Sequence, residues 1–209
     1  MRLNIPNINR ITKFFAVFAM LSGLCLHGYG QALNDYRTRQ IGNWSNANTW
    51  QYYNGTVWVN AVNYPGQNTG SGEVTITSDV TLDISPANAV RSLRLQANLA
   101  QNSFTYQNRI LTVTNNVSLS SGTLNLSNVD GYRITLNIGG NFSMTGGSIT
   151  ESANTYGILV FNGSGTQIFS KTAGTISNNI RFTVNSGSVF DIGTSVIDGS
   201  SGDFTLSSG

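Results

Sequence analysis

A short phrase recurs along this chain and constrains its fold more than any other feature. It reads apolar, Ser or Thr, apolar, two free positions, Gly, one free position, apolar. The copies lie at residues 117–124 (VSLSSGTL), 142–149 (FSMTGGSI) and 182–189 (FTVNSGSV), with an incomplete copy at 204–209 (FTLSSG) and a looser one at 169–176 (FSKTAGTI), where Lys171 replaces an apolar residue. Alternation directs one face of a strand inward, and glycine permits a sharp bend. Each copy is therefore expected to be a strand, a corner and the start of the next strand.

Short strands that recur roughly every 20 to 30 residues, none able to bury its apolar face alone, are typical of a stacked solenoid. The other strand-like segments also alternate with a period of two, and no window shows a helical stripe. The sequence therefore predicts an all-β fold, a right-handed parallel β-helix whose repeats occupy residues 96–209. Because the last copy stops at Gly209, we expect the chain to continue beyond it as part of a longer protein.

The first 32 residues have the features of a secretory signal peptide. Three basic residues precede an apolar run at 14–26, and small residues follow it. Cleavage is expected before Gln31 or before Leu33, since both positions have small residues upstream. The apolar run is too short to span a bilayer comfortably, and no later segment is apolar enough. The prediction is a secreted protein or one on the outer cell surface.

Removal of this peptide excludes several kinds of catalytic and metal site from the mature chain. Cys25 and His27, the only cysteine and histidine, leave with it, which excludes thiol nucleophiles, Ser-His-Asp triads and His or Cys zinc sites. Eight basic and nine acidic residues remain, so no basic footprint for nucleic acid or an anionic membrane is present. Charged residues make up only 10% of the chain, which suits an extracellular β-rich protein. No cofactor is expected.

Residues 33–95 differ from the repeats and are expected to form an aromatic-rich N-terminal cap with the first strands. All three tryptophans fall here, together with several tyrosines: Trp44, Trp50, Tyr52, Tyr53, Trp58 and Tyr64. A solenoid needs such a cap because its terminal coil would otherwise expose apolar core and an unpaired strand edge.

Two stretches resemble known families. Residues 42–95, with a Trp-Ser, a second Trp, a Pro, a Val-Thr-Ile strand and a Leu-Asp, resemble the start of the eight-glycine extracellular domain of large secreted and cell-surface proteins. Residues 110–209, with FNGSGTQ at 161–167 and a strand ending in Val184-Asn, resemble the repeat of large secreted β-solenoid proteins exported by type IX secretion. The second resemblance implies a much longer protein that ends in a sorting domain, which this chain lacks.

Candidate binding residues come from the cap and from the end of the chain. Trp44, Trp50, Tyr53 and Trp58 have flat apolar faces that suit sugar rings, although such a set is more often the core of the cap. Two further residues, Asp198 and Asp203, flank a Gly-Ser loop and are candidates for a weak calcium site, with a solvated turn as the alternative. Neither pattern identifies a ligand.

Three functions are compatible with these features. The first is a non-catalytic structural or adhesive solenoid, and the second is a glycan-binding module that uses the cap aromatics on a polysaccharide or a cell-surface glycan. The third is a β-helix lyase or hydrolase acting on carbohydrate, which needs clustered carboxylates. Asp79 and Asp83 bracket one strand and could share a cation or act as acid and base, but turn residues at strand ends explain them as well. We predict the first function.

Overall fold

The computed structural model describes residues 30–101 and 106–197, together with the backbone of residues 204–206. Residues from Ala32 onward group into one unit, and parallel strands wind through it as a β-solenoid with three walls. The predicted β-helix is therefore confirmed. Within the described residues, no helix is long and apolar enough to cross a membrane.

The first wall contains β1 (Tyr36–Thr38), β5 (Glu73–Ile76), β7 (Ser92–Leu95), β10 (Val117–Leu119), the start of β13 (Phe142–Thr150) and the middle of β15 (Gly165–Ile176). The second wall contains β2 (Gly42–Asn43), β6 (Val80–Leu82), β8 (Leu99–Gln101), β11 (Thr123–Asn125) and the ends of β13 and β15. The third wall contains β9 (Arg109–Val113), β12 (Ile134–Ile138), β14 (Gly157–Phe161), β16 (Ile180–Val184) and β18 (Phe204–Leu206). The start of β15 also pairs with β17 (Ser188–Asp191).

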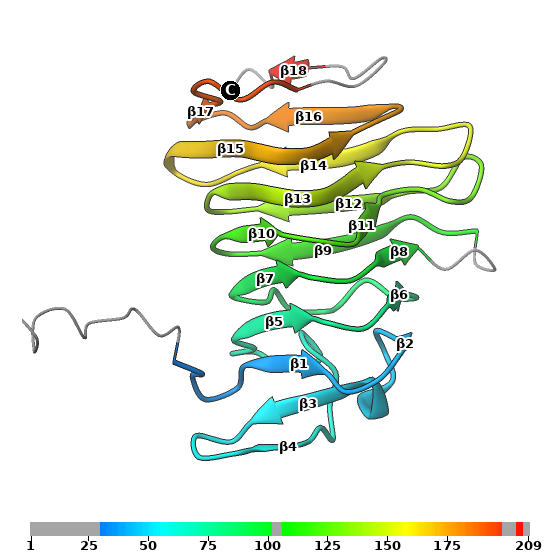
Figure 1. Cartoon of the computed structure of the whole chain (residues 1–209), viewed down its shortest axis with the longest axis vertical. Helices are drawn as coiled ribbons and strands as arrows, with labels where there is room; N and C mark the ends of the chain where they lie inside the picture. The colour runs from blue at the N-terminus through cyan, green and yellow to red at the C-terminus, as the bar shows by residue number, and fades with distance from the viewer. Residues whose placement is uncertain (1–29, 102–105, 198–203, 207–209) are drawn as a thin grey trace, which may run out of the picture. The chain divides into compact units, whose positions relative to one another are not determined.

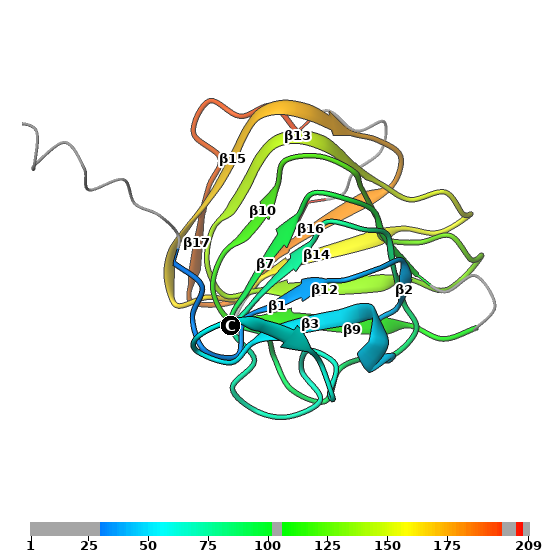
Figure 2. The same ribbon diagram turned by 60° about the horizontal axis from the view of Figure 1, so that its bottom comes forward.

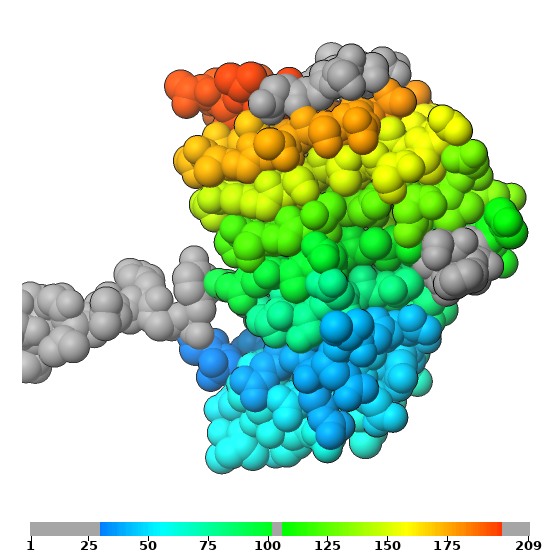
Figure 3. All heavy atoms as spheres, turned by 45° about the vertical axis from the view of Figure 1, so that its right-hand side comes forward, coloured from blue at the N-terminus to red at the C-terminus, as the bar shows by residue number. Residues whose placement is uncertain are grey.

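The winding is right-handed, as predicted. In Figure 1 the strands of the first wall run from left to right in front, those of the third wall run from right to left behind, and the chain climbs from bottom to top. Figure 2 shows the successive coils superposed around one interior. In the space-filling view of Figure 3, each coil forms one band across the visible face. A single short strand is not stable alone, and backbone hydrogen bonds to the strands of adjacent coils stabilise it.

Apolar side chains of successive coils stack in columns inside the walls. On the third wall, Leu111 pairs with Leu136, Leu136 with Leu159, and Leu159 with Phe182, and all four are buried. On the first wall, Val117 pairs with Phe142, and Phe142 pairs with Phe169. The alternation seen in the sequence therefore produces one continuous apolar interior, which is the main stabilising feature of the fold.

The corners between the first and second walls are made by the glycines of the repeated phrase. Gly122, Gly147 and Gly174 have φ of +77°, +72° and +89°, a region that side chains with a Cβ rarely adopt. They also lie one above another: a Cβ on Gly147 would be 2.6 Å from the carbonyl oxygen of Gly122, and one on Gly174 would be 2.6 Å from that of Gly147. Both the backbone angle and the close stacking of coils therefore require glycine here.

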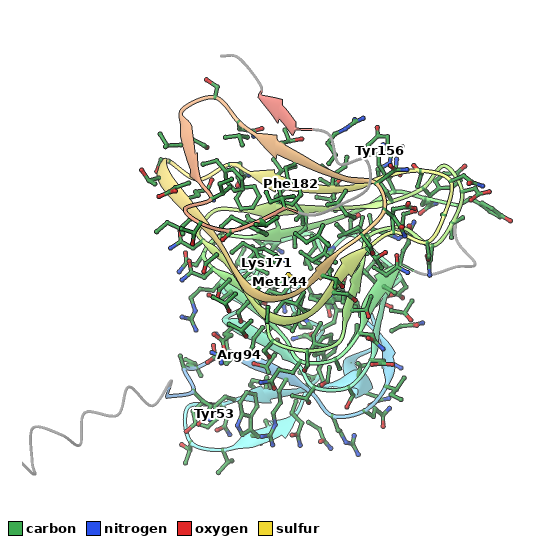
Figure 4. All side chains as sticks on the ribbon, turned by 45° about the horizontal axis from the view of Figure 1, so that its top comes forward. Tyr53, Arg94, Met144, Tyr156, Lys171 and Phe182 are labelled. Atoms are coloured by element: carbon green, nitrogen blue, oxygen red, sulfur yellow. The ribbon has the colours of Figure 1, made fainter. Side chains whose placement is uncertain are left out.

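The copies of the phrase occupy two different walls. The copies that start at Val117, Phe142 and Phe169 lie on the first wall, although the last is the imperfect one with Lys171. The copies that start at Phe182 and Phe204 pair with each other on the third wall. Alternation alone does not specify a wall. Two segments with the same sequence phrase can therefore occupy different walls of the solenoid. Figure 4 shows Lys171 beside Met144, its partner in the ladder.

The N-terminal end is closed by an antiparallel sheet. β1 pairs with β3 (Trp50–Tyr53), and β3 pairs with β4 (Trp58–Asn60), both antiparallel. A short 3-10 helix, η1 (Ala47–Thr49), precedes β3, and the Asn46 side chain accepts a hydrogen bond from the backbone N–H of Asn48 at its start. This sheet lies at the lower end of the stack in Figure 1 and covers the apolar interior there.

Candidate functional site

The four aromatic residues predicted to bind sugar separate into two pairs with different environments. Trp44 and Trp50 are both 0% exposed, with ring centroids 5.1 Å apart in an edge-to-face arrangement. The indole N–H of Trp44 donates to the Pro65 carbonyl, and that of Trp50 donates to the Trp44 carbonyl, each at 2.9 Å. Because neither ring presents a face to solvent, the glycan-binding prediction does not hold for these two. They form the core of the cap.

Tyr53 and Trp58 lie opposite each other on the β3–β4 hairpin and are partly exposed, with ring centroids 5.5 Å apart. The Arg37 guanidinium lies 4.4 Å from the centroid of the Trp58 ring, within the range of a cation–π contact. Its Nε donates to Oε1 of Gln51 at 2.9 Å. Figure 4 places Tyr53 on this hairpin at the lower end of the molecule.

The register of the three strands explains why these side chains share a face. Arg37 pairs with Gln51, Gln51 with Asn60, and Tyr53 with Trp58. Residues that pair directly, or that are two positions apart on one strand, project to the same side of a sheet. Arg37, Gln51, Tyr53, Trp58 and Asn60 therefore form one surface, which we call the hairpin face. It combines aromatic rings with amide and guanidinium donors.

The turn of the hairpin is held by its own hydrogen bonds. The Asn54 side chain accepts from the backbone N–H groups of Thr56 (3.0 Å) and Val57 (2.9 Å). The Tyr53 hydroxyl donates to the Thr56 carbonyl at 3.0 Å. A fixed turn reduces the entropy that the two rings would lose on binding a ligand.

The opposite side of the cap has a hollow of about 180 Å³ beside a second aromatic pair. Its lining residues are Asn34, Tyr36, Tyr52, Val62, Asn63, Asn68, Thr69, Gly70 and Ser71. The rings of Tyr36 and Tyr52 are 6.2 Å apart. Burial, and secondarily the charge of Tyr52, raise the pKa of Tyr36 above its usual value of 10.0. The hollow carries no charged side chain, so it offers only hydrogen bonds and ring contacts.

The carboxylates that were candidates for acid and base chemistry act as acceptors for different partners. Asp83 accepts hydrogen bonds from the backbone N–H (2.9 Å) and the hydroxyl of Ser45. Asp79 accepts from the backbone N–H (3.0 Å) and the side-chain amide (2.9 Å) of Asn98. Each therefore joins neighbouring segments, and the two carboxylates accept hydrogen bonds from different residues.

Further carboxylates have the same role. Buried Asp35 accepts from the backbone N–H groups of Ala32 and Glu73 (both 2.7 Å) and from the guanidinium of Arg91 (2.9 Å). Glu73 pairs with Arg94 at 3.0 Å. Within the described ranges, no group of three or more His, Cys, Asp or Glu residues could hold a metal ion. The calcium candidates Asp198 and Asp203 lie outside the described residues.

A cluster that sequence reasoning missed lies at the start of the third wall. The guanidinium carbons of Arg133 and Arg181 lie 3.9 Å and 3.8 Å from the centroid of the Tyr156 ring. The three residues come from successive coils, so they are far apart in the sequence. Only the register of the coils brings them together. The signal in the sequence is their separation, which is about one coil from each residue to the next.

Comparison with known proteins finds no family model, no curated protein and no solved structure that matches this chain significantly.

Proposed function

We propose that this chain is a secreted, non-catalytic β-solenoid that serves as a structural or adhesive element at the outer cell surface. The observation that carries the proposal is the continuous ladder: side-chain hydrogen bonds join coil to coil at a nearly constant spacing. The Ser148 and Thr123 hydroxyls are 3.0 Å apart and 25 positions apart in the sequence, and Asn141 donates from its backbone N–H to the Asn116 side chain over the same interval. Such cross-linking suits a stiff support.

The use of the carboxylates supports a non-catalytic role. Glycosidases place two carboxyl groups about 5 to 10 Å apart across a substrate. Here Asp35, Asp79 and Asp83 each accept hydrogen bonds that hold the backbone of neighbouring segments. A carboxylate that accepts several hydrogen bonds in this way has a structural role.

The signal peptide and the two resemblances support secretion, and the proposal includes export of a longer protein by type IX secretion. Fractionation of cells that produce the chain tests its location, and deletion of its gene tests its role. We expect the protein outside the cytoplasm with its leader removed. Deletion of the gene should weaken adhesion of the cells to polysaccharide-coated surfaces without changing their secreted polysaccharide-degrading activity. A cytoplasmic location, or release of sugar fragments by the purified chain, contradicts the proposal.

The hairpin face favours a second function, contact with a neutral glycan. Tyr53 and Trp58 offer ring faces, and Gln51 and Asn60 offer amides, a combination that suits a sugar with its apolar face and hydroxyl edge. If a neutral polysaccharide binds the hairpin face, its addition should quench the fluorescence of Trp58. Trp58→Ala should abolish binding, whereas Val62→Ala, at a 79% exposed residue outside the hairpin face, should not. Retained binding by Trp58→Ala excludes this function for the hairpin face.

A further inference from the structure

The hollow beside Tyr36 and Tyr52 lies on the side of the cap sheet away from the hairpin face. Tyr52 pairs with Tyr36 and stands between Gln51 and Tyr53 on β3, and neighbouring residues of a strand project to opposite sides. The loop that follows β4 supplies most of the remaining lining, at residues 62–63 and 68–71. The hollow therefore combines two tyrosine rings with the side chains of one loop.

This loop is held in place by hydrogen bonds at several points. The hydroxyl of buried Ser71 accepts from the backbone N–H of Gly66 at 2.9 Å, and the Gly66 carbonyl accepts from the backbone N–H of Asn88 at 2.9 Å. The Gln67 side chain accepts from the backbone N–H of Tyr64 at 3.2 Å. These bonds fix the lining without a ligand, so little conformational entropy is lost on binding.

Three amide side chains of the lining, those of Asn34, Asn63 and Asn68, have no hydrogen-bond partner among the residues that the structure describes. Asn34 also has a φ of +66°, which is uncommon for a residue other than glycine. Its backbone N–H donates to the Tyr53 carbonyl at 2.9 Å, and its carbonyl accepts from the Gly72 N–H at 2.8 Å. Sparsely populated backbone conformations concentrate at functional sites. The fold thus holds the Asn34 backbone at both groups and leaves its amide available to a ligand.

The lining of the hollow is neutral. No charged side chain belongs to it. Burial raises the pKa of Tyr36, so its hydroxyl keeps its proton at neutral pH and can both donate and accept hydrogen bonds. A ligand with a net charge would lose hydration here without gaining an ionic partner. The hollow therefore suits an uncharged ligand that carries several hydroxyl groups.

A second hollow, of about 450 Å³, adjoins the first and shares Gly70 and Ser71 with it. It is also lined by Leu33, Gly72, Ala89, Arg91 and Thr114. The guanidinium of Arg91 pairs with the carboxylate of Asp35 at 2.9 Å, so its charge is already matched. A ligand that fills the first hollow can therefore extend into the second without meeting an unpaired charge.

We propose that the first hollow, which we call the cap hollow, binds the terminal ring of a neutral oligosaccharide, with the next sugar in the adjoining hollow. Amides bond pairs of hydroxyls as donor and acceptor, and tyrosine rings pack on the apolar face of a sugar. Pockets for drug-sized ligands measure about 300 to 1,000 Å³. The cap hollow, at about 180 Å³, suits a single ring. This site goes beyond the hairpin face because it lies on the other side of the sheet and receives a chain end.

The test measures binding by saturation-transfer NMR to the whole purified chain carrying Trp58→Ala, which removes the central ring of the hairpin face. The probes are glucose, galactose, mannose, xylose and N-acetylglucosamine, each as the free sugar and as its linear trisaccharide. We expect at least one trisaccharide to bind, and to bind more tightly than its free sugar, because a second unit contacts the adjoining hollow. Added salt should change this binding little, since no ionic contact forms. Trigalacturonate, which carries three carboxylates, should bind at least about tenfold more weakly.

Variants of the lining separate binding from folding. Asn34→Gly removes the amide and keeps a residue that accepts positive φ. Asn63→Ala and Tyr52→Phe remove an amide and a hydroxyl, respectively. Each should weaken binding about three- to tenfold, the loss of one or two hydrogen bonds, with little change in the thermal melt. Asn48→Ala, at an exposed cap residue outside both hollows and the hairpin face, is the matched control and should bind normally.

Four outcomes overturn the proposal. They are no binding of any sugar in the panel, full binding by both Asn34→Gly and Asn63→Ala, binding of trigalacturonate as tight as that of the neutral trisaccharides, and tighter binding of an N-acetylated, C-amidated tripeptide than of every sugar. Sugar binding that is present in the native chain and lost in Trp58→Ala would assign the site to the hairpin face instead. Failure at the cap hollow is therefore distinguishable from failure of the hairpin face, and the scaffold function depends on neither.

Discussion

The side-chain amide of Gln167 donates a 2.8 Å hydrogen bond to the main-chain carbonyl of Ile138, 29 positions earlier in the chain. The same nitrogen donates to the Gly140 carbonyl at 2.5 Å, and the amide oxygen accepts from the backbone N–H of Gly163 at 2.8 Å. Gln167 is 2% exposed. It therefore joins backbone groups of two coils where the chain leaves the third wall, and it shares the Ile138 carbonyl with the backbone N–H of Asn162.

Replacement of Gln167 by Glu should destabilise the fold strongly. Glutamate has the same shape but no donor, so a carboxylate would face the two carbonyl oxygens in a buried site. We expect a loss of more than about 3 kcal/mol in the free energy of unfolding at pH 7, measured by urea denaturation. Protonation restores one donor, so part of the loss should disappear at low pH. A variant with native stability at pH 7 would contradict this role.

Alanine at a stacked corner glycine should cost more than alanine at an unstacked one. Gly122 and Gly131 have similar φ, +77° and +79°, but a Cβ on Gly122 would collide with the backbone of Ala97, whereas one on Gly131 meets nothing within 4 Å. Gly131→Ala should lose about 1 to 2 kcal/mol from backbone strain alone. Gly122→Ala should lose clearly more. Equal urea midpoints would show that coil stacking does not require glycine.

The two aromatic pairs of the cap should differ in their effect on stability. Trp44→Ala removes a fully buried ring and should lower the free energy of unfolding by about 3 to 5 kcal/mol. Trp58→Ala, at a partly exposed residue on the edge strand β4, should cost much less. Thermal denaturation followed by circular dichroism measures both. Similar losses would mean that the hairpin face is part of the core.

The tyrosines should ionise in a definite order in a spectrophotometric titration of the native chain. Contact with Arg133 and Arg181 lowers the pKa of Tyr156, so its phenolate should form below pH 10, and Tyr156→Phe should remove this early step. Desolvation raises the pKa of Tyr36, so Tyr36→Phe should remove a late step. An unchanged titration curve in either variant contradicts the assignment for that residue.

The same shifts predict opposite effects of pH on stability. Tyr36 favours its neutral form in the fold, so its contribution is complete below about pH 10 and is lost as pH rises through its raised pKa. Tyr36→Phe should therefore make unfolding less sensitive to alkali. Tyr156 favours its ionised form, so its contribution is present above about pH 10 and is lost as pH falls through its lowered pKa. Urea denaturation of each variant across this range measures both.

The walls and corners of the solenoid could be predicted because each depends on local chemistry. Alternation at residues 142–149 is enough to indicate an inward face, and the required φ at Gly147 is enough to indicate a bend. The placement of phrases on walls could not be predicted. Lys171 made the first-wall copy appear imperfect, while the better copy at Phe182 belongs to the third wall.

The candidate surfaces were only partly predictable for a related reason. Burial of Trp44 and Trp50 depends on how η1 and β3 fold against the first coils, which the composition of the cap does not determine. The contact of Arg133 and Arg181 with Tyr156 depends on the number of residues in each coil. That number varies: the Asn141 N–H bonds the Asn116 side chain over 25 residues, and the Ile168 N–H bonds the Asn141 side chain over 27.

This unequal coil length has a consequence for how the chain can be altered. The asparagine bonds continue through Asn116 and Asn141 although the separation of the bonded positions changes from 25 to 27 residues. The loops between walls can therefore be lengthened or shortened by design while the ladder and the apolar columns are kept. The solenoid thus separates positions that tolerate new sequence from those that the fold requires.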